Sequence, residues 1–246
     1  MSTLLIRLAG PLQSWGINSN FDTRATERYP SKSGVIGLLA AAQGIRRDGD
    51  LSALCALGFG VRADKEGTIL KDYHTVHGVK SSYVTYRYYL ADAVFLAGVE
   101  SEDEAFLLQL DDALKHPVFP LFLGRRSCPP ALPLSLGIRE GVGVWDALKR
   151  EPWIAPQWYQ KRMERRGEAQ TLRVITDAAA NERGSVSVRD VPESFSPYHR
   201  KYGYRGAIER KGVLMAPEAI LPEAISTEHD PFLELEGGHV PEQTGT

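Results

Sequence analysis

Basic residues stand beside aromatic residues and glycines at four places in this chain of 246 residues. Lysine and arginine contact phosphates, whereas aromatic rings and guanidinium planes stack on unpaired bases. One such stretch alone is typical of a solvated surface. Four of them, in a chain with a formal net charge of −2, indicate a positive groove on a mildly acidic protein, which would serve either to bind RNA or only as a solvated surface. The stretches are Arg24/Arg28/Lys32, 86–89, 122–126 and 198–212.

The stretch RYPSKSGVIGLLAAAQGI joins a basic, hydroxylated first half to an apolar second half. The second half predicts a buried helix over residues 34–43, with Gly44 in the usual terminating position. The first N–H groups of a helix lack partners within it, and the helix dipole adds positive charge there. Lys32 and Ser33 lie at this end, and Gly34 would let an anion approach the backbone. The helix start is therefore either a phosphate site or an ordinary serine cap with solvated cations nearby.

The sequence offers fewer candidate residues for catalysis than for RNA binding. Tyr73, His74, His77 and Lys80 could supply an acid, a base and an electrostatic stabiliser for RNA cleavage, but such residues also serve plain RNA binding. In a strand, His74 and His77 would point to opposite faces, so we expect no metal site there. The SKSG sequence has the wrong residue order for a nucleotide-triphosphate loop. We predict no cofactor and keep a metal-independent endoribonuclease as the alternative function.

The strands and helices that would position these side chains are predicted from the residue patterns of the first 120 residues. These patterns predict the order strand, helix, hairpin, strand, helix, which suggests an α+β fold close to the ferredoxin-like (RRM-related) plan. Residues 117–124 are the candidate for the last strand, although their prolines would confine it to a sheet edge. The other predicted elements are strand 3–10, helix 34–43, a hairpin of 56–64 with 67–76, one or two strands in 81–99, and helix 101–115 capped by Ser101.

The amino-acid composition of the chain changes after residue 125. We expect residues 1–125 to form an RNA-binding domain and residues 126–225 a smaller β-rich part, with strands at 170–177 and 184–191. Residues 226–246 are polar, and we expect a flexible tail. The two cysteines suggest reduced thiols, and no signal peptide or bilayer-spanning segment is evident. These features favour a cytoplasmic protein that does not interact with membranes.

Five segments occur in an order that resembles a known family: LIRLAGPLQSWG, RYPSKSGVIGLLAAAQGI, KDYHTVHG, YRYYLADAVF and FLGRRSCPP. Together they resemble CasD, the family of Cas-five-type subunits of the type I-E CRISPR surveillance complex Cascade. The resemblance spans roughly residues 4–130 and implies a ferredoxin-like domain with a thumb hairpin. It implies a non-catalytic subunit that binds the 5′ handle of the CRISPR RNA and caps the backbone filament. The implied partners are the CRISPR RNA, the CasC backbone subunits, the large subunit CasA, the other Cascade subunits and, through the complex, target DNA.

The resemblance also implies roles for ten residues. Arg87 and Phe122 would contact handle bases or their sugars, and His74 would lie beside the base of the thumb. The segment between KDYHTVHG and YRYYL is short, so the thumb would be short or drawn from other residues. A type I-C cousin cleaves precursor RNA, a task that belongs to the separate subunit CasE in type I-E. The residues implied to hold handle phosphates are Arg24, Arg28, Lys32, Ser33, Gly34, Arg125 and Arg126.

Overall fold

The computed structural model describes residues 1–16, 23–78, 81–166, 170–179, 181–196 and 198–215. The predicted tail 226–246 lies outside this part. The helices are α1 (Lys32–Ala42), α2 (Ser52–Cys55), α3 (Glu104–Lys115), α4 (Val144–Arg150) and α5 (Gln157–Arg165). The strands are β1 (Ser2–Ala9), β2 (Leu12–Gln13), β3 (Thr23–Arg24), β4 (Gly58–Lys65), β5 (Thr68–His77), β6 (Ser82–Ala91), β7 (Val94–Ser101), β8 (Ser135–Arg139), β9 (Gln170–Asp177), β10 (Val186–Ser194) and β11 (Lys201–Met215). The fold is mixed α+β, as predicted, with mostly antiparallel strands.

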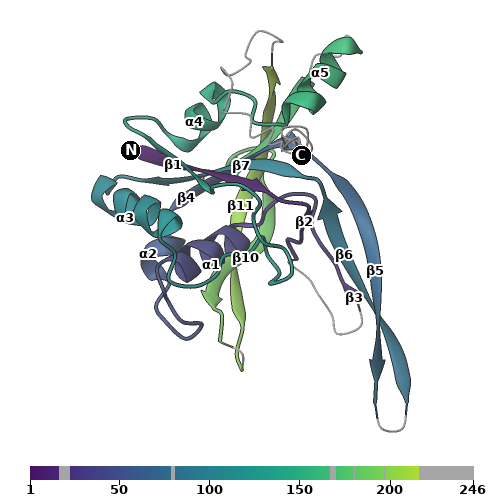
Figure 1. Cartoon of the computed structure of the whole chain (residues 1–246). Helices are drawn as coiled ribbons and strands as arrows, with labels where there is room; N and C mark the ends of the chain where they lie inside the picture. The colour runs from purple at the N-terminus through teal and green to yellow at the C-terminus, as the bar shows by residue number, and fades with distance from the viewer. Residues whose placement is uncertain (17–22, 79–80, 167–169, 180, 197, 216–246) are drawn as a thin grey trace, which may run out of the picture.

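The larger sheet has seven strands within the described residues, in the order β10-β11-β9-β4-β7-β1-β8. Its neighbouring strands are antiparallel. Side chains alternate between two cores, since Leu4 and Ile6 of β1 face one and Leu5 faces the other. Helices α1 and α3 cover the first face, and α4 covers the second (Figure 1). The sheet is therefore the middle of three layers.

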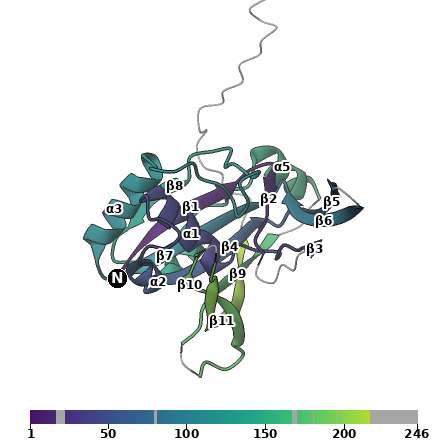
Figure 2. The same ribbon diagram turned by 90° about the horizontal axis from the view of Figure 1, so that it is seen from below.

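The smaller sheet carries a long hairpin. Strand β6 pairs with β2, β3 and β5, and the β5–β6 register runs over ten residue pairs from Thr68–Ala91 to His77–Ser82. This β5–β6 ribbon projects away from the three layers, at the side of the molecule opposite α3 (Figure 1 and Figure 2). Its outer part exposes apolar side chains, including Tyr73, Val76 and Tyr83. The prediction of a thumb that is short or drawn from other residues stays a prediction, and the structure shows a ribbon of ten residue pairs at this place in the chain.

Several predicted elements are confirmed. Helix α1 is largely buried and is followed by Gly44, whose φ of +77° is the left-handed conformation that ends many helices. Strand β9 matches the predicted 170–177, and β10 overlaps the predicted 184–191. Helix α3 is also present. The prediction that Ser101 caps it is wrong, because the Asp103 carboxylate accepts the hydrogen bond from the N–H of Phe106.

The predicted hairpin of 56–64 with 67–76 is wrong. Strand β4 pairs with β7 and β9, whereas β5 pairs with β6 in the other sheet. The turn between them carries the chain from one sheet to the other. At Gly67 (φ +74°) a Cβ would lie 2.6 Å from the carbonyl oxygen of Ala91, so the backbone passes too close to the ribbon base for a larger residue.

The predicted last strand at 117–124 is also wrong. Its place at the sheet edge is taken by β8, which pairs with β1. The N–H groups of Val118 and Phe119 instead donate to the carbonyls of Ala42 and Ala41, so this segment satisfies the C-terminal end of α1. Pro117 lacks an N–H group, which fits a capping segment better than a sheet strand.

Strands from both sides of residue 125 share the larger sheet, because β9 pairs with β4. The division of the chain at this residue stays a prediction. Within the described residues, no helix has both the length and the apolar character needed to cross a bilayer.

Candidate nucleic-acid interface

Two arginines predicted to bind RNA lie at paired positions on β3 and β6. Arg24 is the register partner of Arg87 in this parallel pair, so the two side chains leave the sheet on the same face. Arg24 is exposed, whereas Arg87 is half-buried, and its Nε has no hydrogen-bond partner among the described residues. Like charges at paired positions repel, and a buried donor without a partner is costly. An anion at this edge would reduce the repulsion between the two arginines and accept a hydrogen bond from the unpaired Nε.

The loop 122–128 is anchored against the end of β2. The N–H of Ser14 donates to the carbonyl of Leu123 at 3.1 Å, and the N–H of Leu123 donates to that of Cys128 at 2.7 Å. Gly124 has a φ of +84°, and a Cβ there would lie 1.7 Å from the carbonyl oxygen of Ser14. No other residue fits this contact without movement of the backbone. The loop therefore has a fixed position beside β6.

Within this loop, Arg125 connects β3 and β6 through hydrogen bonds to their backbone. Its Nη1 donates to the carbonyl of Tyr88 at 3.1 Å, and its Nη2 donates to that of Arg24 at 2.8 Å. The guanidinium also lies 4.8 Å from the ring centroid of Tyr89. These contacts hold β3 and the loop against β6. Arg126, the next residue, is exposed, so it is the better placed of the two to meet a phosphate.

The start of α1 is closed by an internal network of ion pairs. The backbone N–H of Lys32 donates to the Asp190 carboxylate at 2.8 Å, and the Lys32 Nζ lies 3.0 Å from Asp177. Arg205 joins both carboxylates, at 2.7 Å to Asp190 and 2.8 Å to Asp177. Burial acts to lower the pKa of Arg205, but the hydrogen bonds and negative charges of Asp190 and Asp177 raise it overall. An internal carboxylate thus stands where a phosphate was predicted.

Ser33 and Gly34 are also occupied by internal contacts. Ser31 caps α1 by accepting a hydrogen bond from the N–H of Gly34, and the Ser33 hydroxyl lies 3.2 Å from that of Ser31. A Cβ on Gly34 would lie 2.7 Å from the buried ring of Trp15. Phosphate binding by Lys32, Ser33 and Gly34 stays a prediction, and these contacts disfavour it.

The remaining predicted residues are Arg28, Phe122 and His74. Arg28 is exposed and follows Glu27, which pairs with Trp15 beside β2. Phe122 is half-buried at the start of the anchored loop. His74 is exposed on the ribbon, with its Nε2 2.7 Å from Asp72. The structure therefore brings Arg24, Arg87 and the 122–126 loop together and directs Lys32 elsewhere.

The two ribbon histidines do not converge. His74 and His77 differ by three positions in β5, so their side chains lie on opposite faces. His77 instead pairs with the hydroxyl of Ser82 at 2.9 Å. The described residues contain no cluster of three or more His, Cys, Asp or Glu that could hold a metal ion. An acid–base pair made of both histidines is not formed.

Sequence reasoning missed one feature of the ribbon. The Nζ of Lys71 lies 4.2 Å from the ring centroid of Tyr86, and Tyr73, the register partner of Tyr86, is exposed on the same face. The signal in the sequence is the spacing, because Lys71 and Tyr73 differ by two positions and lie on one face of a strand. The ribbon thus exposes a cation and aromatic rings on one face.

Comparison with known proteins identifies the family. A family described as CRISPR-associated protein (Cas_Cas5) matches residues 3–208. The CRISPR system Cascade subunit CasD of Escherichia coli (strain K12) is 41% identical over 159 residues, which cover 55% of this chain and 70% of that relative. This chain therefore belongs to the Cas5 family of CRISPR-associated proteins, as its sequence predicted.

Solved structures agree with this assignment. A crystal structure of a Cas protein is 38% identical with a TM-score of 0.65, and the match covers 89% of this chain and 97% of that one. A chain of a CRISPR RNA-guided surveillance complex is 34% identical with a TM-score of 0.70, over 86% of this chain and 91% of that one. The mixed α+β fold is thus shared with these structures.

Proposed function

We propose that this chain is a non-catalytic subunit of a type I-E Cascade complex. It binds the 5′ handle of the CRISPR RNA and caps one end of the backbone filament, and in this way supports RNA-guided recognition of target DNA in antiviral defence. Its partners are the CasC backbone subunits, the large subunit CasA and the other Cascade subunits. The names of the E. coli relative and of the solved surveillance complex support this assembly.

The observation that carries RNA binding is the placement of Arg24 beside Arg87 on the β3–β6 edge. Arg126 is exposed on the anchored loop next to this edge, and Arg28 is exposed beside β2. A single strand along the edge would find phosphate partners in these arginines and a stacking partner in Phe122. His74 would lie farther out, on the ribbon.

We also propose that the N-terminal part follows the ferredoxin-like plan. Strands β4, β7, β1 and β8 are neighbours in this order and antiparallel. Helix α1 lies between β1 and β4 in the chain, and α3 lies between β7 and β8. The domain would then end at Arg139 rather than at residue 125, and the β5–β6 ribbon, inserted before β7, would be the thumb that reaches a backbone subunit.

The test is co-purification of this chain with CasC, CasA and the other subunits, followed by sequencing of the bound small RNA. We expect RNAs with a common 5′ end, and RNA crosslinks to peptides that contain Arg24 or Arg126. A complex that assembles without any such crosslink would contradict RNA binding by this chain. Purified protein incubated with repeat RNA in EDTA is expected to leave it intact, and specific cleavage would favour the endoribonuclease.

A further inference from the structure

A cavity of about 530 Å³ lies between α5, the β4–β5 turn and the start of β9. None of the ten residues predicted to bind RNA lines it. We infer that this α5 cavity binds a nucleoside monophosphate, either free or as one unit of a single strand. Its volume falls within the range of small-molecule pockets. Its main charged and aromatic lining residues are Lys65, Glu66, Asp92, Trp158, Arg162 and Arg173.

The α5 side of the cavity combines aromatic rings with cations. The Nζ of Lys65 lies 4.6 Å from the ring centroid of Trp158 and 5.5 Å from that of Tyr159. Trp158 is 56% exposed, so its ring is accessible to a ligand. A tryptophan face attracts cations and also stacks on nucleobases. A base on this face would displace the flexible lysine side chain, which can then pair with the phosphate.

The cations that line the cavity differ in whether carboxylates balance their charge. Arg173 donates to Glu209 at 2.9 Å and lies 3.6 Å from Glu66, and its hydrogen bond to Glu209 raises its pKa. Its charge is therefore balanced by carboxylates. Lys65 and Arg162 have no ion-pair partner within the described residues and would take the phosphate. A carboxylate such as Asp92 is the usual acceptor for ribose hydroxyls.

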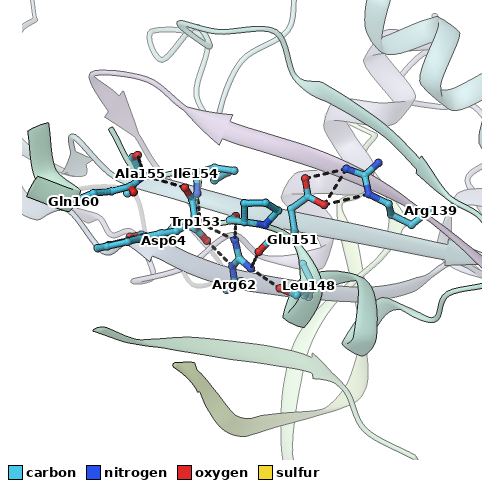
Figure 3. Close-up of polar contacts among 10 residues, drawn as sticks. Arg62, Asp64, Arg139, Leu148, Glu151, Trp153, Ile154, Ala155 and Gln160 are labelled. Atoms are coloured by element: carbon cyan, nitrogen blue, oxygen red, sulfur yellow. Dashed lines mark hydrogen bonds and ion pairs between the residues drawn. The ribbon is translucent and has the colours of Figure 1, made fainter. Parts of the chain in front are cut away.

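The two walls of the cavity are fixed to each other before any ligand binds (Figure 3). Gln160 of α5 donates to the carbonyls of Trp153 at 2.9 Å and Ala155 at 2.8 Å. The indole N–H of Trp153 in turn donates to the carbonyl of Asp64 at the end of β4, at 2.8 Å. Buried Arg62 holds the Asp64 carboxylate through two 2.8 Å hydrogen bonds. A preorganised site of this kind loses little conformational entropy on binding.

Titration of the full-length protein with adenosine 5′-monophosphate, followed by calorimetry, tests the inference. We expect saturable binding, weakened at least about fivefold by Trp158→Ala, as for loss of a stacked base. Arg162→Ala should weaken it as well. Trp158→Phe should retain most of the affinity, and Lys161→Ala, an exposed cation of the same helix that does not line the cavity, should leave it unchanged. Thermal melts establish that each variant is folded.

The inference is overturned if the wild-type protein shows no saturable binding, or if the folded Trp158→Ala variant binds as the wild type does. Inorganic phosphate that binds as tightly as the nucleotide would overturn the stacking contact. Single-stranded RNA containing 4-thiouridine distinguishes the two sources of the ligand. A crosslink to α5 assigns the nucleotide to a strand, whereas nucleotide binding without this crosslink assigns it to a free nucleotide. The outcome is independent of the arginines of the β3–β6 edge.

Discussion

Two groups of cations in this molecule, similar in sequence, lie in opposite surroundings. At the start of α1, Lys32 is buried against Asp177 and Asp190, and its charge is balanced inside the protein. At the β3–β6 edge, Arg24 and Arg126 are exposed. At a basic helix start, carboxylates of the protein itself can thus occupy the place of an external anion. Whether such a helix start can bind an external anion depends on whether a carboxylate from elsewhere in the fold already contacts it.

The closed network gives the largest expected effect. Asp190→Ala removes a fully buried carboxylate that bonds Arg205 and the N–H of Lys32, so it leaves a buried guanidinium short of partners. We expect a loss of about 3–5 kcal/mol in the free energy of unfolding, measured by denaturant titration. Asp48→Ala, at an exposed position, serves as the control. A loss below about 1 kcal/mol would mean that the network is not what holds the helix start.

The open edge depends on the position of its loop, which Gly124 tests. Gly124→Ala places a Cβ against the carbonyl of Ser14 and should cost more than the 1–3 kcal/mol typical of backbone strain. Gly184→Ala is the matched control, because its φ of +89° is similar but no atom lies within 4 Å of the added Cβ. Equal losses in the two variants would show that the contact with Ser14 does not anchor the loop.

Lys32→Met compares the two groups directly. Asp177 keeps Arg205 as a partner, so we expect a loss of about 1.5–3 kcal/mol for one charged hydrogen bond, seen in a thermal melt. RNA retention in the assembled complex should stay as in the wild type. A folded Lys32→Met variant that loses its RNA would return the phosphate site to the start of α1.

The sequence predicted local structure well. The apolar run of α1 and the β-branched residues of β9 are local signals for a helix and a strand, and both elements lie where they were expected. Pairing between strands was harder, because β4 and β5 are adjacent in the chain but belong to different sheets. No local pattern indicates that the turn between them ends one sheet and starts another.

The surroundings of the candidate site residues could not be predicted from the sequence for the same reason. The carboxylates that contact Lys32 lie 145 and 158 residues further along the chain, beyond the reach of any motif. Arg125 likewise bonds the backbone of β6 and β3, a contact that depends on tertiary structure. The basic and aromatic composition indicates candidate residues but not which cations stay accessible.

The most direct test of the account reverses the charge of the open edge in the assembled complex. Arg24→Glu together with Arg126→Glu is compared with Lys149→Glu together with Arg150→Glu, an equal change on exposed residues of α4. The RNA retained per purified complex is measured alongside the thermal stability of each variant. We predict that the edge variant loses most of its RNA, since two phosphate contacts become repulsions, while the α4 variant keeps it. Equal RNA retention in the two folded complexes would contradict the account.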